Sequence, residues 1–278
     1  MKIGKISVSL ICLLLLQGFA FSQQDILQTF DEGVLNWTNL TIYVTGKGRP
    51  DPELSPAQYR LSALISARKD ATESILEILK NINFTSELRV GQLIEKSEAI
   101  KAQIEKIIDD LQIIGKPRHM LDGTVEIDVE FHLFDEFLNV VLPQNGDKLA
   151  EFISDESSGE DNALENQVYS YTGLIVDCRG LQVDFALAPK VLDEQGQEVY
   201  GPGWVNHKIA LTAGIVQYVR DEDKAFARVG EVPIKIKGLH ISGTGRCDVI
   251  IANADAVRLL NKDNLNFLNM CKVAFLVE

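Results

Sequence analysis

Four polar side chains in the second half of the chain stand where α/β proteins place ligands. They follow two predicted strands, Gly173–Val176 and Val249–Ala252. The four residues are Asp177, Arg179, Asn253 and Asp255. Because open α/β sheets bind ligands beyond the carboxyl ends of their strands, these side chains could form one polar site in an enclosed pocket. The interpretation that we favour is simpler: Asp255 caps the following short helix, and Asp177 pairs with Arg179 in a loop.

No other pattern predicts catalysis or a bound cofactor. The chain has neither a G-x-S-x-G elbow nor a Walker loop. Two short motifs, Gly46-Lys47-Gly48 and Gly243-Thr244-Gly245, lack the other glycines and the Ser/Thr of a phosphate loop, and we expect the first to be a turn at the end of a strand. The acid pairs 109/110 and 126/128 are expected on solvated faces. We therefore expect no catalytic residue and no cofactor.

The histidines and cysteines do not indicate a metal site either. No histidine pair has the spacing of zinc ligands, and no CxxC occurs. The histidines are His119, His132, His207 and His240. We expect surface or structural roles for them, and buried apolar positions for the cysteines outside the first 22 residues. Those cysteines are Cys178, Cys247 and Cys271, an odd number that leaves at least one thiol without an intramolecular disulfide.

The first 22 residues have the pattern of a secretory signal peptide. Two lysines precede an apolar run over residues 6–21, and small residues flank a cleavage position between Ser22 and Gln23. The length and flanks of the run suit a signal better than a membrane anchor. Cys12 lies inside the run rather than after the cleavage position, which argues against a lipid anchor. We expect an exported protein that begins at Gln23 and has no transmembrane span.

The composition is that of a globular protein with an acidic balance. The 278 residues are 46% hydrophobic and 24% charged, and 27 basic against 40 acidic residues give a net charge of −13. Loss of Lys2 and Lys5 with the signal makes this −15. Such a charge disfavours nucleic acid as a partner and steers the protein away from anionic lipid. Attachment to an envelope is therefore expected to need a protein partner.

The chain is expected to form two domains joined by an acidic connection. Residues 144–167 carry seven acidic residues and one lysine around a Ser-Ser-Gly sequence, which is typical of a linker or an exposed loop. The predicted organisation is a signal peptide at 1–22, a first domain at 23–143, the connection at 144–167 and a second domain at 168–278.

The first predicted domain reads as a β-α-α-β-β unit. Residues 40–45 alternate as a half-buried strand, and Ser55, Pro56 and Gln58 begin a helix that continues to about residue 79. A second helix covers residues 100–111. Residues 124–133 alternate as a strand with one helix-covered face and one wet face, on which Glu126, Asp128, Glu130 and His132 lie.

The second predicted domain is also mixed. Strands are expected at 173–176, 186–192, 198–200, 234–241, 249–252 and 273–277, and helices at 209–218 and 255–261. The whole chain is therefore predicted to be α+β, a mixed α/β fold of two small sheets each covered by helices.

Two stretches resemble known bacterial envelope proteins. The strand Val44–Gly48, the helix Leu61–Leu79 and the segment Asp122–Glu126 resemble the LPP-twenty lipoprotein family and the N-terminal domain of the flagellar assembly protein T family. The second half resembles the C-terminal region of uncharacterised secreted bacterial proteins. The segments that carry this resemblance are Tyr171–Gly180, Ala186–Asp193, Val199–Gly201 and Asn253–Ala256.

This resemblance implies a cell-envelope protein in the periplasm or at the outer membrane, associated with outer-membrane or flagellar structures. Together with the export signal, it favours a non-enzymatic protein that acts by binding another envelope protein or by assembly. The alternative is a periplasmic ligand-binding or enzymatic domain that uses the four polar residues. We expect the second half to dock the partner, because it holds several aromatic residues of the kind found in interface cores. These are Tyr171, Tyr200, Trp204 and Tyr218.

Overall fold

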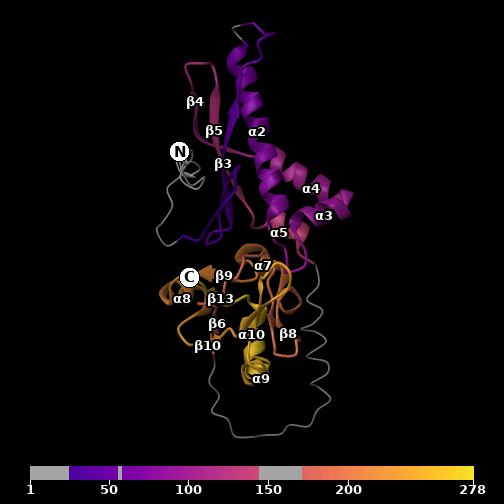
Figure 1. Ribbon diagram of the computed structural model, residues 1–278, viewed down its shortest axis with the longest axis vertical. Helices are drawn as coiled ribbons and strands as arrows, with labels where there is room; N and C mark the ends of the chain where they lie inside the picture. The colour runs from indigo at the N-terminus through magenta and orange to yellow at the C-terminus, as the bar shows by residue number, and fades with distance from the viewer. Residues whose placement is uncertain (1–24, 56–57, 144–170) are drawn as a thin grey trace, which may run out of the picture. The chain divides into compact units, whose positions relative to one another are not determined.

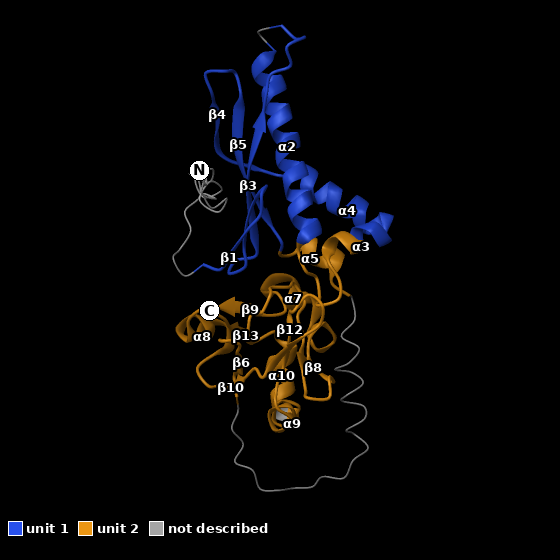
Figure 2. Cartoon of the chain, viewed as in Figure 1, with its two compact units in different colours: residues 1–81, 94–133 blue, residues 82–93, 134–278 orange. Residues whose placement is uncertain are grey.

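The computed structural model describes residues 25–55, 58–143 and 171–278 (Figure 1). The predicted signal peptide and the predicted acidic connection lie outside these residues. The chain forms two compact units, residues 1–81 with 94–133 and residues 82–93 with 134–278 (Figure 2). The predicted mixed α+β fold is confirmed. The units differ from the predicted domains in that residues 82–93 and 134–143 group with the second half of the chain.

Unit 1 is a five-stranded antiparallel sheet with helices along one face. The strands are β1 (Leu27–Thr29), β2 (Gly33–Asn36), β3 (Thr41–Gly48), β4 (Ile113–His119) and β5 (Val125–His132), in the order β1-β2-β3-β5-β4. The helices are α2 (Tyr59–Asn81) and α4 (Glu98–Asp109). The predicted strands at 40–45 and 124–133 correspond to β3 and β5, and the predicted helices correspond to α2 and α4; β1, β2 and β4 were not placed from the sequence. Figure 1 shows α2 running alongside the sheet.

The Gly46-Lys47-Gly48 motif serves helix packing and not a turn. Strand β3 continues through both glycines, so the expected end of the strand at Gly46 is wrong. A Cβ atom on Gly48 would lie 2.0 Å from the carbonyl oxygen of Ala63, and one on Gly46 would lie 2.2 Å from that of Ala67. The two glycines therefore let the α2 backbone rest directly on the strand.

One residue of the expected wet face is buried. Asp128 is 9% exposed, because Arg118 of β4 covers its carboxylate with two hydrogen bonds and Thr45 donates a third at 2.8 Å. Burial raises the pKa of Asp128, but the bonds from Arg118 and Thr45 outweigh it and hold the pKa below its ordinary value. Strand β4 was missed in the sequence, since Gly115 and Pro117 break its pattern.

Unit 2 contains two four-stranded sheets. The first is entirely parallel, with β10 (Pro233–Lys237), β6 (Gly173–Asp177), β13 (Val273–Leu276) and β9 (Gln217–Val219) in that order. The second is mixed, with β11 (His240–Ser242), β12 (Asp248–Ile250), β7 (Val191–Leu192) and β8 (Glu198–Tyr200).

Short helices complete unit 2. They are α5 (Glu136–Val141), α7 (His207–Ala213), α8 (Glu222–Val229), α9 (Asn253–Leu259) and α10 (Leu265–Asn269), with 3₁₀ turns at Pro202–Trp204 and Lys262–Asn264. Helix α3 (Val90–Lys96) begins in the segment 82–93 and ends in unit 1. Helix α8 packs through Ala225 and Val229 on Ile175 and Ala274 of the parallel sheet.

Three expectations for unit 2 are wrong in detail. The helix expected over 209–218 ends at Ala213, because Gly214 adopts a left-handed φ of 72°, and β9 follows. The strand expected over 234–241 is two strands in different sheets, divided around Gly238. The strand expected over 186–192 is reduced to Val191–Leu192, directly after Pro189 and Lys190.

Candidate functional site

The four sequence-predicted site residues lie at the ends of elements that belong to two different sheets. Asp177 ends β6 in the parallel sheet, while Asn253 and Asp255 begin α9, which follows β12 of the other sheet. No hydrogen bond or ion pair joins the first pair of residues to the second among the described residues. The structure therefore does not support their use as a common ligand site.

Asp177 and Arg179 form the local ion pair of the favoured interpretation. Arg179 donates from Nε at 2.9 Å and from its terminal nitrogen at 2.6 Å, and its backbone N–H donates at 3.1 Å. These hydrogen bonds hold the pKa of Asp177 below its ordinary value. The pair closes the turn after β6.

Asn253 and Asp255 hold the start of α9 by different means from those expected. Ala252 occupies the N-cap position, so the expectation that Asp255 caps the helix is wrong; it lies in the first turn. Asn253 instead exchanges two hydrogen bonds with Glu194 of the β7–β8 turn, both 3.2 Å long. The result is a link between a helix start and a hairpin, a structural role.

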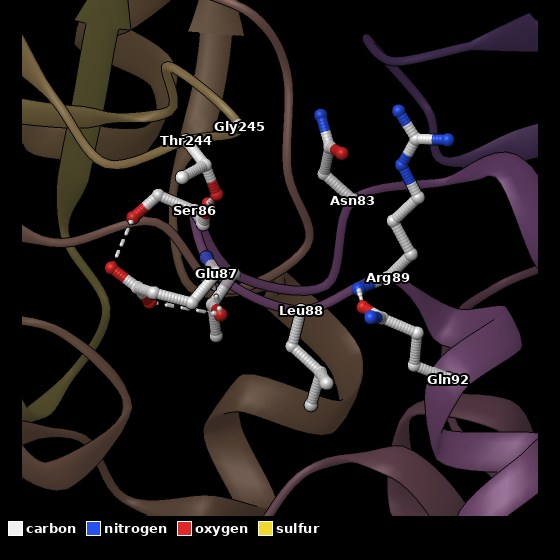
Figure 3. Close-up of a pocket in the computed structure, with 9 residues that line it drawn as sticks. Asn83, Ser86, Glu87, Leu88, Arg89, Gln92, Thr244 and Gly245 are labelled. Carbon is white, nitrogen blue, oxygen red and sulfur yellow. Dashed lines mark hydrogen bonds between the residues drawn. The ribbon is translucent and has the colours of Figure 1, made fainter.

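Unit 2 carries a different hollow that the sequence did not reveal (Figure 3). Its volume is about 460 Å³, and it is partly open to solvent. One wall is a tight loop of the segment 82–93, and the other is the Gly243-Thr244-Gly245 turn. The lining residues are Asn83, Thr85, Ser86, Glu87, Leu88, Arg89, Gln92, Thr244 and Gly245. Its volume falls in the range of small-molecule sites in proteins.

Ser86 fixes the floor of the hollow. Its carbonyl oxygen accepts hydrogen bonds from the Gly245 N–H at 2.6 Å and from the Thr244 hydroxyl at 2.9 Å. A Cβ atom on Gly243 would lie 2.2 Å from the Ser86 Cβ, and Gly243 has a φ of 79°, so this position favours glycine on two grounds. The Gly243-Thr244-Gly245 turn therefore holds Ser86 in place.

Beneath the floor, the Ser86 hydroxyl bonds the carboxylate of Asp248, which is 2% exposed. Burial raises the pKa of Asp248 above its ordinary value, against hydrogen bonds from Ser86 and from the Lys190 N–H. The same hydroxyl is 3.0 Å from Glu87 Oε1 and has one proton for two carboxylates. The Ser86 hydroxyl therefore donates its proton to only one of the two carboxylates at a time. Since Ser86 is only 1% exposed, its hydroxyl is not presented as a nucleophile.

The rim of the hollow includes the basic residue Arg89. The backbone of Arg89 is held by two contacts: its N–H donates to Gln92 Oε1 at 2.8 Å, and it forms an antiparallel β-bridge with Asn83. Its guanidinium makes no hydrogen bond or ion pair with any residue in the described part of the chain. Asn83 donates from Nδ2 to the Phe185 carbonyl at 3.2 Å. The sequence offered no signal for this site, because its two walls are distant in the chain.

Unit 1 carries a second feature, a gathering of exposed apolar side chains. Three adjoining segments hold them: the loop after β3, the first turns of α2 and the β4–β5 turn. Pro50 lies 3.2 Å from the Cβ position of Gly123, and the Asp51 N–H donates to Ser62 of α2 at 3.1 Å. We call this surface the apolar end, and it consists of Leu54, Leu61, Ile65, Met120 and Leu121.

The apolar end stands out against the rest of the described surface. Leu61 and Ile65 are each 61% exposed, and Leu121 is fully exposed. Nine large apolar side chains are exposed in the described residues, and five of them lie here. Leu61 and Ile65 lie one turn apart on α2, and neighbouring exposed apolar side chains of this kind mark contact sites in soluble proteins.

The aromatic residues expected to form a docking surface lie mostly in the core. Tyr200, Trp204 and Tyr218 are buried in unit 2. Tyr218 packs edge-on against Phe185 and Phe275, and its hydroxyl bonds both backbone groups of Ala186. Tyr171 is half-buried and bonds Arg258 through its hydroxyl at 2.7 Å. The expectation that these aromatics form a docking surface is therefore wrong for those three.

The three cysteines after the predicted signal have buried surroundings. All three cysteines after the predicted signal are buried and free of disulfides. Burial raises the pKa of Cys178 and Cys247 to about 12 and that of Cys271 to about 11. No cluster of three or more His, Cys, Asp or Glu residues that could hold a metal ion occurs in the described ranges. Within the same ranges, no helix has the length and apolarity needed to cross a bilayer.

Comparison with known proteins places the second half in a bacterial context. Residues 173–278 match a domain family described as the second domain of Treponema pallidum Tp0624. The match covers both sheets of unit 2 but not the segment 82–93, which supplies one wall of the hollow. A search of curated proteins found no match.

Proposed function

We propose that this chain is an exported, non-enzymatic protein of a bacterial cell envelope, and that it acts by binding another protein through the apolar end of unit 1. The signal-like N-terminus supports export. The resemblance of the first half to the LPP-twenty lipoprotein and flagellar assembly protein T families supports an envelope location, in the periplasm or at the outer membrane. The similarity of residues 173–278 to a Treponema pallidum domain supports a bacterial source.

The single observation that carries the proposed contact is the concentration of exposed apolar side chains at one surface. Five large apolar side chains there are exposed to water unless a partner covers them. Burying them in a contact would stabilise the complex by ~25 cal/mol for each Å² of apolar surface removed from water. The charges around them decide the kind of partner. Asp51, Glu53 and Asp122 offset Arg49 and Arg60, so the surface has no basic excess for anionic lipid. A protein partner fits this mixed rim better than a lipid surface.

The test compares matched charge substitutions in the mature chain. We expect Leu61→Asp and Leu121→Asp each to lower retention by envelope fractions, because each places a carboxylate in a buried contact. Val257→Asp is the control, since Val257 is 75% exposed on α9 of unit 2. Equal retention of all three variants would refute the proposed contact, and retention on protein-free lipid vesicles would refute a protein partner.

Export is tested separately. N-terminal sequencing of the protein from the periplasmic or membrane fraction is expected to start at or within a few residues of Gln23. Recovery of the intact precursor in the cytoplasm would contradict it. This outcome does not depend on the apolar end, so the two parts of the proposal fail independently.

A further inference from the structure

We infer that the hollow of unit 2 is a binding site for a carboxylate presented by a peptide, and that Arg89 anchors it. The site is distinct from the apolar end of unit 1, and the inference does not depend on the proposed contact there. It also differs from the four polar residues expected from the sequence, none of which lines the hollow.

The first ground is the state of the Arg89 guanidinium. Six of the ten arginines bond a carboxylate, a carbonyl or a phenol: Arg68, Arg118, Arg179, Arg228, Arg246 and Arg258. Arg89 bonds none in the described part of the chain, although acidic residues outnumber basic ones by 13. Arg89 lines the hollow, its five N–H donors are available in the described part of the chain, and a planar fork of donors matches a carboxylate.

The second ground is that the hollow holds its shape without a ligand. Two hydrogen bonds from the Gly243–Gly245 turn and one from the Ser86 hydroxyl to Asp248 pin one side of the loop. On the other side, the Phe84 and Thr85 N–H groups both donate to the Leu88 carbonyl, at 2.8 and 3.0 Å. Because the backbone of the site is already ordered, ligand binding costs little free energy for ordering it.

The remaining lining residues restrict the ligand. Figure 3 shows the Glu87 side chain beside Ser86 and the Arg89 side chain pointing away from it, and the two form no ion pair. The carboxylate of Glu87 disfavours a ligand with several negative charges. The Leu88 side chain and the amides of Asn83 and Gln92 offer apolar contact and hydrogen bonds to a neutral remainder. A peptide with one carboxylate meets these requirements, whereas a phosphate dianion does not.

The experiment uses NMR titration of the mature chain with two capped peptides, acetyl-Gly-Leu-Glu-Gly-amide and its Gln counterpart, and with inorganic phosphate. We expect the Glu peptide to shift the Arg89 Nε–H and Gln92 side-chain amide signals saturably, and to bind about fivefold more tightly than the Gln peptide, as for the loss of one exposed ion pair. Arg89→Gln should abolish that preference, and Arg89→Lys should keep part of it.

Arg220→Gln is the matched control. Arg220 is an exposed arginine of unit 2 outside the hollow, and it has no hydrogen-bond or ion-pair partner among the described residues. This variant should bind the Glu peptide as the unmodified chain does. The inference is overturned if both peptides bind equally, if Arg89→Gln and Arg220→Gln have the same effect, if phosphate binds more tightly than the Glu peptide, or if no signal near the hollow moves at millimolar peptide.

Discussion

Arg228 of α8 offers the sharpest stability prediction, because its half-buried side chain donates only to carbonyl oxygens. Nε donates to the Cys271 carbonyl at 2.7 Å, and the terminal nitrogens donate to three carbonyls at the end of α7 and just beyond it. These belong to Ala213, Gly214 and Ile215. Burial lowers the pKa of Arg228 below its ordinary value, while Tyr200 and Cys271 act to raise it. The arginine thus joins α8, the end of α7 and the start of β13.

We expect Arg228→Met to lower the free energy of unfolding of unit 2 by about 4 kcal/mol. Each hydrogen bond to a charged group contributes ~1.5–3 kcal/mol, and an orphaned buried carbonyl costs ~1–3 kcal/mol. The four bonds do not add fully, because removing the guanidinium also removes its desolvation cost. Arg228→Lys keeps the charge but removes the planar set of guanidinium donors, and we expect it to lower the free energy of unfolding by about 2 kcal/mol.

The assay is urea unfolding followed by tryptophan fluorescence. The chain has two tryptophans, Trp37 in unit 1 and Trp204 in unit 2, both buried. A Trp37→Phe background therefore leaves Trp204 to report on unit 2 alone. Arg220→Met is the control, and we expect it to change stability by less than ~0.5 kcal/mol, as for most surface substitutions. A loss below ~1 kcal/mol for Arg228→Met, with an unchanged m-value, would show that the carbonyls find water and that the argument is wrong.

Three further predictions test other contacts. Gly48→Ala should destabilise unit 1 by about 3 kcal/mol, because its Cβ would lie 2.0 Å from the Ala63 carbonyl oxygen; thermal unfolding against Lys47→Ala measures this. The thiols of Cys178, Cys247 and Cys271 should not react with a thiol reagent at pH 8 in the native protein, and all three should react after unfolding. Fast labelling of the native protein would contradict their burial. The pKa of Asp128 is lowered in the folded state, so its stabilising effect is present above the unfolded-state pKa of about 3.9 and is lost as the pH falls through the lower folded value. Asp128→Asn should remove that part of the acid dependence, and unchanged acid profiles would disprove the role of Arg118.

Local patterns predicted much of the fold. Strand β5 alternates cleanly, as predicted. The second predicted helix is α4, which begins at Glu98 rather than at residue 100, after the cap residue Ser97 that the prediction did not name. The hairpin of β7 and β8 follows from the turn residues 193–196. The ion pair of Asp177 with Arg179 was also predictable, because its partners are two residues apart.

Contacts between distant segments were not predictable. Asp128 looks solvated in its own strand, and only the neighbouring strand β4 supplies the Arg118 that buries it. Gly46 and Gly48 resemble a turn until the alanines of α2 are placed on them. The hollow depends on Ser86 meeting Asp248, 162 residues later, and no local period carries that information.

The membership of residues 82–93 in unit 2 has a consequence for how the chain is made. A chain that emerges from its N-terminus can complete the sheet of unit 1 once residue 133 is available. Phe84 and Ser86, both buried in the finished protein, must then wait until residues 186–188 and 243–248 emerge. Such long-range closure is slow and leaves an intermediate with an uncovered loop. A fragment that begins at residue 168 would lack the loop permanently.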